Sequence, residues 1–225
     1  MLEREREAVA AACRRLAADG LVLGTAGNVS ARAGEEVAIS PTGAALAAVS
    51  PEQISVVDLD GRVAAGDLEP TSELDLHLGV YHRYAAGAVV HTHAPMATAL
   101  SCVLDEVPCL HYQMLLLGGS VRVARYATFG TPELAEEVLE ALEGRTAALM
   151  ANHGAIAYGQ DVDQAVDFSL LLEWACTVYW RATAIGTPRV LDHGQRAAVV
   201  AAALERDYGA TKPASSASRE QPEAR

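Results

Sequence analysis

The stretch Thr146-Ala-Ala-Leu-Met-Ala-Asn-His-Gly-Ala-Ile-Ala-Tyr158 decides the fold, because it places two short apolar runs on either side of a tight turn. Residues 146–151 predict one strand, Asn152-His153-Gly154 a turn, and residues 155–158 a second strand. Strands joined by so short a connection pair antiparallel, since parallel strands need a long crossover.

Outward from this hairpin, helix and strand patterns alternate. Further strands are predicted around Gly34 within residues 24–42, at 55–64 with a turn at Asp60-Gly61, at 88–93 and at 121–124. Helices are predicted at residues 2–19, 73–84, from Pro95, from Thr131-Pro132, at 161–185 and at 192–208. Interleaved helices and strands with several short turns indicate an α/β protein. Its sheet should be largely antiparallel and covered by helices on both faces.

The composition excludes several classes of function. A net charge of −12 opposes long-range attraction to nucleic acid or to anionic lipid. Apolar runs end well short of a membrane span. The first seven residues, Met-Leu-Glu-Arg-Glu-Arg-Glu, alternate charges where a signal peptide would need an apolar run. A cytoplasmic enzyme without nucleic-acid or membrane partners is expected.

Lysine and cysteine usage narrows the chemistry further. Lys212 is the only lysine, and it lies in a Ser- and Ala-rich tail (210–225) that is expected to be disordered. Schiff-base catalysis needs a lysine amine desolvated in a pocket, so this chain is not expected to use it. The four cysteines show no CxxC spacing and lie among apolar residues, so we expect buried, reduced side chains.

His91 and His93 stand two residues apart on a predicted strand. Side chains at this spacing point to the same face, so both imidazoles are expected to lie a few ångströms apart. Such a pair can offer two nitrogen ligands to zinc, although two hydrogen-bonded histidines would be equally consistent with the pattern. His153, in the turn before Gly154, would complete the three-ligand pattern of an open catalytic zinc site.

Glu73 begins a predicted helix directly after Thr71 and Ser72. A glutamate in a first helical turn is ordinarily favoured by the helix dipole, and the sequence alone gives it no other role. His77, one turn later, is either its partner on the same helix face or a surface residue.

Three loop segments carry small polar residues that could receive a phosphate group without a lysine. They are Gly27-Asn28, Thr42-Gly43 and Thr71-Ser72. Hydroxyls, an amide and exposed backbone N–H groups suit this purpose, although each pair by itself is more typical of an ordinary turn.

Seven motifs between residues 7 and 190 together resemble one known family. They are Gly24-Thr-Ala-Gly-Asn-Val-Ser30, Ser40-Pro-Thr-Gly43, Pro70-Thr-Ser-Glu73, Val89-Val-His-Thr-His-Ala94, His111-Tyr112, Tyr126-Ala-Thr-Phe-Gly-Thr131 and Asn152-His-Gly154. Their order and spacing resemble the class II aldolase/adducin-head superfamily, and within it the L-fuculose-1-phosphate aldolases.

The resemblance implies a single three-layer α/β/α domain over residues 1–209 that assembles as a homotetramer with active sites at subunit interfaces. By position, it assigns one zinc ion per subunit, or another divalent ion, to His91, His93 and His153. Glu73 takes the position of the catalytic acid/base, which can also approach the metal. Tyr112 matches a tyrosine that reaches into the neighbouring subunit's site.

The resemblance also assigns the contacts with a phosphorylated sugar substrate. Phe129 corresponds to an aromatic wall of the site, and Tyr208 to a tyrosine of a mobile tail. The phosphate site corresponds to Gly27, Asn28, Thr42, Gly43, Thr71 and Ser72. Thr71 departs from the family's usual serine but keeps the hydroxyl.

The implied reaction is reversible cleavage of a ketose 1-phosphate, such as L-fuculose 1-phosphate, to dihydroxyacetone phosphate and L-lactaldehyde. Zinc would act as the Lewis acid, Glu73 would move the carbon-bound proton, and Tyr112 would hold or protonate the aldehyde oxygen. Rhamnulose- and 5-deoxyribulose-phosphate aldolases and methylthioribulose-phosphate dehydratases remain alternatives.

Two further alternatives fit the sequence less well. Pentulose-phosphate 4-epimerases resemble this chain but carry aspartate where Glu73 stands. An adducin-like binding head would lack the three histidines, all of which are present here.

Overall fold

The computed structural model describes residues 1–206 and divides the chain into two compact units, Met1–Leu191 and a second unit that begins at Asp192. The second unit contributes helix α6 (His193–Arg206) to the described part of the chain. The boundary predicted at residue 209, the tail 210–225 and Tyr208 lie outside the described residues. Among the helices within residues 1–206, none combines the length and apolar character that a membrane span needs.

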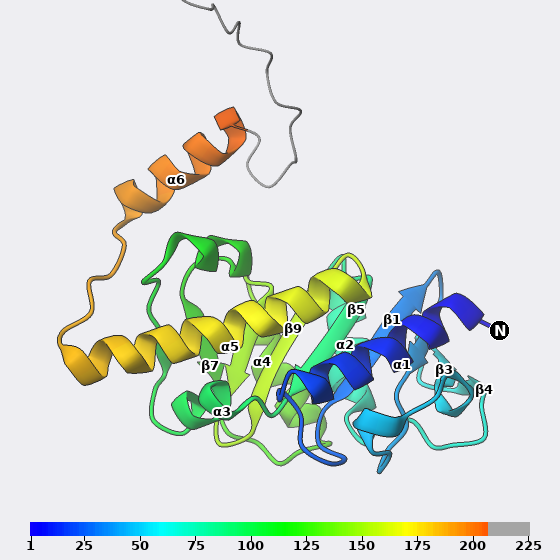
Figure 1. Ribbon diagram of the computed structural model, residues 1–225. Helices are drawn as coiled ribbons and strands as arrows, with labels where there is room; N and C mark the ends of the chain where they lie inside the picture. Colours follow the sequence, from blue (N-terminus) through cyan, green and yellow to red (C-terminus); the bar gives the residue numbers. More distant parts are fainter. Residues whose placement is uncertain (207–225) are drawn as a thin grey trace, which may run out of the picture. The chain divides into compact units, whose positions relative to one another are not determined.

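A nine-stranded sheet forms the middle layer of the first unit, with the strand order β4-β3-β2-β1-β5-β9-β8-β7-β6 (Figure 1). The strands are β1 (Asn28–Ala33), β2 (Glu36–Ile39), β3 (Ser55–Asp58), β4 (Val63–Ala65), β5 (Ala88–Thr92), β6 (Glu106–Val107), β7 (Val121–Ala124), β8 (Ala147–Met150) and β9 (Gly154–Gly159). Among these described strands, only β7 and β8 pair parallel. The predicted, largely antiparallel sheet is therefore confirmed.

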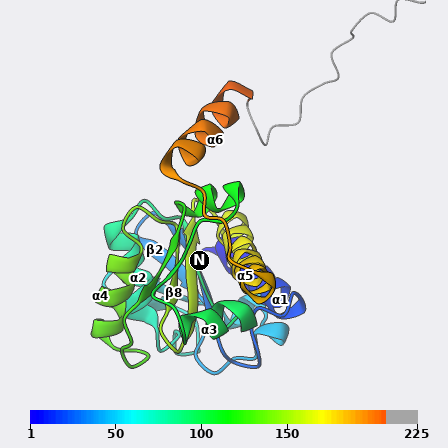
Figure 2. The same ribbon diagram turned by 90° about the vertical axis from the view of Figure 1, so that its left-hand side faces the viewer.

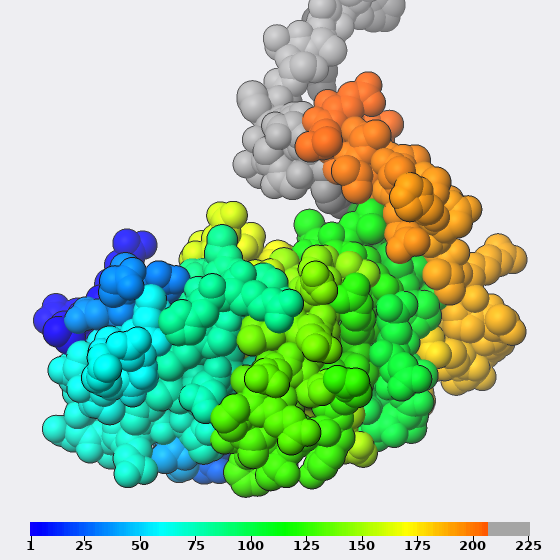
Figure 3. All heavy atoms as spheres, turned by 180° about the vertical axis from the view of Figure 1, so that it is seen from behind, coloured from blue at the N-terminus to red at the C-terminus, as the bar shows by residue number. Residues whose placement is uncertain are grey.

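Five helices cover the two faces of this sheet. Helices α1 (Glu3–Ala18), α3 (Pro95–Ser101) and α5 (Val162–Ile185) lie on one face, and α2 (Leu74–Arg83) and α4 (Pro132–Ala141) on the other (Figure 2). On the second face, α2 and α4 pack side by side (Figure 3). Each face of the sheet has its own buried apolar cluster. Because the strands are apolar on both sides, helices must cover both faces, and the predicted three-layer α/β/α arrangement follows.

The central strand β5 sets the position of the histidine pair. All five of its residues are buried, and it pairs antiparallel with β1 on one side and β9 on the other. His91 stands opposite Asn28 of β1 and Ile156 of β9. Because the hairpin between β8 and β9 turns at residues 151–153, His153 lies at the same edge of the sheet as His93.

Three details differ from the sequence-based expectations. Glu73 is the residue before α2 rather than its first residue. Strand β6 and the short 3-10 helices η1 (Leu46–Ala48), η2 (Pro51–Gln53) and η3 (Tyr112–Leu117) carry too few residues to show a periodic pattern. All four cysteines are free, but Cys102 is exposed at the end of α3, so the expectation of burial was wrong for this residue.

Candidate active site

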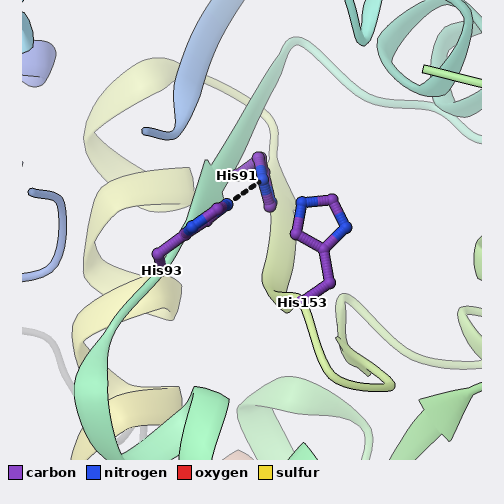
Figure 4. A group of neighbouring side chains, drawn as sticks. All are labelled: His91, His93 and His153. Carbon is purple, nitrogen blue, oxygen red and sulfur yellow. Dashed lines mark hydrogen bonds between the residues drawn. The ribbon is translucent and has the colours of Figure 1, made fainter. Parts of the chain in front are cut away.

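Three imidazoles converge at the end of β5 and at the β8–β9 turn (Figure 4). His91 Nε2 lies 3.0 Å from His93 Nε2, and the ring centroids of the three histidines are 4.8 to 5.0 Å apart. One ligand nitrogen from each ring lies within 4.8 Å of the other two. The prediction that His91 and His93 lie on the same side is confirmed, and His153 joins them from a segment 60 residues further along the chain.

Local backbone requirements bring His153 to this place. Asn152 adopts a left-handed conformation with φ of 56°, which asparagine tolerates better than most residues. A methyl group on Gly154 would overlap the carbonyl oxygen of Thr92, so only glycine lets the turn approach β5 this closely. The Asn-His-Gly sequence thus places the third imidazole beside the other two.

A hydrogen bond fixes the orientation of His91. Its Nδ1 lies 2.9 Å from the carbonyl oxygen of Ala155, which can only accept, so Nδ1 carries the proton. In the neutral ring, Nε2 then presents its lone pair to the space between the three histidines. A second hydrogen-bond partner that sets the tautomer of the ring is typical of metal-binding histidines.

The surroundings of His93 and His153 disfavour their protonated forms. Burial, together with the neighbouring His91 and His153, lowers the pKa of His93 to about 4. Burial and His91 likewise lower the pKa of His153 to about 4. Neutral rings keep the lone pairs that a metal ion requires.

Glu73 faces the three histidines from the start of α2. Its Oε2 lies 3.1 Å from His91 Nε2 and accepts a hydrogen bond of 2.9 Å from the Asn28 amide, and its Oε1 lies 3.5 Å from His153 Nε2. Burial opposes the charged form, but His91, Asn28 and His153 together hold the pKa of Glu73 well below its usual range. Within residues 1–206, Oε1 has no hydrogen-bond partner although it is buried.

The donor set fits a divalent metal ion. Zinc–nitrogen bonds of about 2.0–2.1 Å at tetrahedral angles place ligand nitrogens roughly 3.3 Å apart, close to the spacing of the His91 and His93 nitrogens. Ligand nitrogens of the three histidines lie within 4.8 Å of one another, and the Glu73 carboxylate, with one buried oxygen that lacks a hydrogen-bond partner, adjoins two of them. Such a concentration of electron-rich atoms is stabilised by a cation.

A cavity of about 460 Å³ opens beside this cluster. Of the residues predicted to form the site, it is lined by Gly27, Asn28, Thr42, Gly43, Thr71, Ser72, Glu73, His93, Phe129 and His153. His91 is fully buried behind this surface. Tyr112 does not line the cavity; it lies on η3 and is 40% exposed.

Backbone pairing draws the loops of the predicted phosphate site together. The Thr42 N–H donates to the carbonyl oxygen of Glu69 at 3.0 Å, and the Thr71 N–H donates to that of Ser40 at 3.1 Å. Gly27 has a φ of 88°, and a Cβ there would meet the His91 carbonyl oxygen at 2.9 Å. These contacts hold segments that are distant in sequence around one opening.

Six further residues line the cavity without having been predicted as site residues: Thr25, Ala26, Pro41, Tyr126, Ala127 and Asn152. All six belong to the motifs quoted above, so their place in those motifs was the available signal. Among the described residues that line the cavity, none is a lysine or an arginine. An anion bound here would therefore be held by hydroxyls and amide groups rather than by a cationic side chain.

Comparison with known proteins agrees with this geometry. The family model described as "Class II Aldolase and Adducin N-terminal domain" matches residues 7–180. The 5-methylthioribulose-1-phosphate/5-deoxyribulose-1-phosphate aldolase of Rhodospirillum rubrum is 41% identical over 182 residues, 80% of this chain and 82% of the relative. The L-fuculose phosphate aldolase of Escherichia coli K12 is 37% identical over 190 residues, 84% of this chain and 88% of the relative.

A solved structure gives the same result. That of an L-fuculose 1-phosphate aldolase superposes with a TM-score of 0.85 at 33% identity, covering 88% of this chain and 95% of the other. The family match spans well over half of the chain and includes all three histidines and Glu73. The chain therefore belongs to the class II aldolase and adducin N-terminal domain family, close to the L-fuculose-phosphate aldolases.

Proposed function

We propose that this protein is a metal-dependent aldolase that reversibly cleaves a ketose 1-phosphate to dihydroxyacetone phosphate and an aldehyde. The observation that carries the proposal is the convergence of three imidazoles and the buried carboxylate of Glu73 beside a polar cavity. The two relatives of this protein described above are named as aldolases, which are lyases. Class II aldolases use a divalent metal ion, which agrees with the cluster of three histidines.

His91, His93 and His153 would hold one zinc ion, or another divalent ion, per subunit. When bound, the ion supplies the Lewis acidity that polarises the substrate's ketone oxygen. A lysine imine would be the other way to stabilise the carbanion, but the sole lysine, Lys212, lies outside the described residues in a segment without family resemblance.

Glu73 would serve as the acid/base. As a buried anion at the cavity wall, it would remove the carbon-bound proton of dihydroxyacetone phosphate in the synthetic direction and return it during cleavage. Its unpartnered Oε1 is the oxygen available for this proton or for the metal.

The phosphate group would be bound by the three loops that surround the opening, with Gly27, Asn28, Thr42, Gly43, Thr71 and Ser72 as its contacts. Backbone N–H groups and hydroxyls bind phosphate without a cationic side chain, and local capture of this kind is compatible with the negative charge of the whole chain. Phe129, 67% exposed at the rim, would form an aromatic wall over the bound sugar.

Tyr112 would act across a subunit interface in a homotetramer. It is 40% exposed and does not line the cavity of its own chain. Large apolar side chains near it are also exposed, including Leu116 at 59% and Trp174 at 40%, which is consistent with coverage by another subunit. In the neighbouring site, its hydroxyl would hold or protonate the aldehyde oxygen.

L-Fuculose 1-phosphate is the first substrate to test, and 5-deoxyribulose 1-phosphate is the second. 5-Deoxyribulose 1-phosphate is supported by the higher identity to the Rhodospirillum rubrum relative, 41% against 37% for the L-fuculose phosphate aldolase. Both ketoses end in a methyl group and yield dihydroxyacetone phosphate. They differ in the aldehyde, which is L-lactaldehyde for the six-carbon sugar and acetaldehyde for the five-carbon sugar.

A product assay tests the proposal. Metal-loaded protein is incubated with L-fuculose, L-rhamnulose, 5-deoxyribulose and 5-methylthioribulose 1-phosphates, and dihydroxyacetone phosphate and each aldehyde are measured. Cleavage of at least one, abolished by a chelator and restored by zinc, is expected. Formation of an epimer or of a dehydrated sugar instead would reassign the reaction. Binding of metal and phosphate without turnover of any substrate would contradict the aldolase proposal.

A further inference from the structure

A row of five buried polar side chains extends from Glu73 into the core. Helix α2 and the residue before it contribute Glu73, His77 and Tyr81, which are spaced four residues apart and therefore share one helix face. Strand β1 contributes Asn28 and Ser30, spaced two apart on one strand face. All five residues are at most 6% exposed.

Hydrogen bonds link these side chains without a gap. The Asn28 amide nitrogen donates to Glu73 Oε2 at 2.9 Å, and its oxygen lies 2.5 Å from His77 Nε2. At the other side of the ring, His77 Nδ1 lies 2.7 Å from Ser30 Oγ. Ser30 Oγ is in turn 2.7 Å from the Tyr81 hydroxyl.

The hydrogen bond that the Asn28 amide nitrogen donates to Glu73 gives this row one direction. With its nitrogen toward Glu73, the Asn28 amide presents its oxygen, which can only accept, to His77. His77 must then donate from Nε2 and accept at Nδ1 from the Ser30 hydroxyl. Ser30 in turn accepts from Tyr81.

The row ends in the protein interior. Tyr81 is 3% exposed, and burial raises the pKa of its hydroxyl well above the usual range. Burial also lowers the pKa of His77 to about 3, with His91 adding to this effect. Neither group exchanges protons with solvent readily, so the row is suited to holding side chains in place rather than to conducting protons.

We propose that His77 is a positioning residue: its Nε2–H fixes the Asn28 amide so that one amide N–H holds Glu73 and the second points to the phosphorylated ligand in the cavity. Asn28 lines the cavity, and an amide nitrogen carries two hydrogens, of which Glu73 takes one. The assignment to a phosphorylated ligand rests on the proposed function. The arrangement of His77, Asn28 and Glu73 does not.

The kinetic test compares His77→Leu with His77→Gln, whose amide keeps a donor, and with Val80→Ala. Val80 is fully buried on the same helix but outside the row, so its truncation matches a loss of packing. His77→Leu should lower kcat by roughly 10- to 100-fold, the loss of activity that follows removal of an outer hydrogen-bonding partner in metal sites. It should also weaken competitive inhibition by inorganic phosphate, because the Asn28 amide is no longer held in place. His77→Gln should regain a substantial part of both.

Val80→Ala should keep kcat and phosphate competition near the wild-type values while lowering the melting temperature. Wild-type kcat in His77→Leu would overturn the proposal. So would equal losses of kcat in His77→Leu and Val80→Ala, because these would show only a loss of packing.

A second measurement does not depend on any activity. In protein labelled with 15N at histidine, His77 should show a protonated Nε2 and an unprotonated Nδ1 across the neutral pH range. A protonated Nδ1 would mean that the row runs in the reverse direction, and would overturn the proposed role of His77. If the tautomer is as expected but no ketose phosphate is cleaved, the proposed function fails and the positioning of Asn28 by His77 stands.

Discussion

Glu73 combines burial with an incomplete set of partners. Its Oε2 is held by Asn28 and faces His91, whereas Oε1 is buried without a hydrogen-bond partner among residues 1–206. A buried oxygen in this state is costly unless a ligand, a metal ion or a proton completes it. This observation supports the proposal that Glu73 takes part in the reaction.

Replacement of Glu73 by glutamine should remove proton transfer while retaining the fold. We expect proton exchange at dihydroxyacetone phosphate to fall by ~10²–10⁴-fold, the usual contribution of a general base. The exchange is followed by NMR in deuterated water. Glu69→Gln serves as the control, since Glu69 is an exposed glutamate nearby and should exchange like the wild type. Near wild-type exchange by Glu73→Gln would show that Glu73 is only a helix-end carboxylate.

Replacement of His153 by alanine should reduce the metal content of the protein. With one of three imidazoles missing, less than one equivalent of zinc should remain after dialysis, as measured by elemental analysis. His82→Ala is the matched control, because His82 is exposed on α2 and bonds to the carbonyl oxygen of Leu59 at 3.0 Å, away from the histidine cluster. If His153→Ala retains a full equivalent of zinc, the metal is bound elsewhere.

At the residue scale, the sequence could predict what local geometry determines. The spacing of His91 and His93 sets their common side, because strand periodicity is fixed. The approach of His153 depends on how β9 aligns with β5, and no local pattern contains that register. For the same reason, the sequence did not decide whether His77 is a partner of Glu73 or a surface residue. Its hydrogen-bond partners Asn28 and Ser30 lie on a different element.

At the scale of elements, α3 and α5 are joined by a carboxylate that caps a helix. Glu173 of α5 accepts hydrogen bonds from the backbone N–H groups of Met96 at 2.9 Å and Ala97 at 2.8 Å, at the start of α3. Helix α3 begins two residues after His93, so this contact also fixes the end of the segment that carries the histidine pair. An anion at a helix N-terminus is favoured by the exposed N–H groups and the helix dipole.

Replacement of Glu173 by alanine should destabilise the protein by about 1.5–3 kcal/mol, the usual range for hydrogen bonds to a charged group. Asp167→Ala is the comparison on the same helix. Asp167 pairs with Arg15 at 3.2 Å, but the two side chains are 64% and 47% exposed, so its loss should cost at most about 1 kcal/mol. Denaturant unfolding measures both. Equal losses would show that the cap on α3 contributes no more than a surface ion pair.

Most helices and strands could be predicted because each carries a recognisable cap or periodic pattern in its own sequence. Thr131 and Asp161 cap their helices through side-chain oxygens as expected from their sequence positions. Strand β6, only two residues long, owes its pairing to β7 rather than to its own sequence. Helix η3, which carries Tyr112, likewise lacks a pattern long enough to be recognised.

At the scale of the whole molecule, the exposed position of Tyr112 outside its own cavity has a testable consequence. His91→Ala and Tyr112→Phe should each be inactive. Mixed tetramers should recover about a quarter of wild-type activity, because half of the subunits keep the metal site and half of their neighbours keep the tyrosine. Activity is measured after equal amounts are denatured and refolded together, with each variant refolded alone as the control. Mixed tetramers without activity would place Tyr112 in the site of its own chain.

Proton exchange at dihydroxyacetone phosphate tests the central claim most directly, because it requires the metal, the base and the phosphate site but no knowledge of the aldehyde. Wild-type protein is incubated with dihydroxyacetone phosphate in deuterated water, without metal and with zinc. We predict that one carbon-bound hydrogen beside the ketone is replaced by deuterium with zinc present, and that a chelator stops the exchange. Exchange at an equal rate in the metal-free protein, or none with zinc bound, would contradict the account.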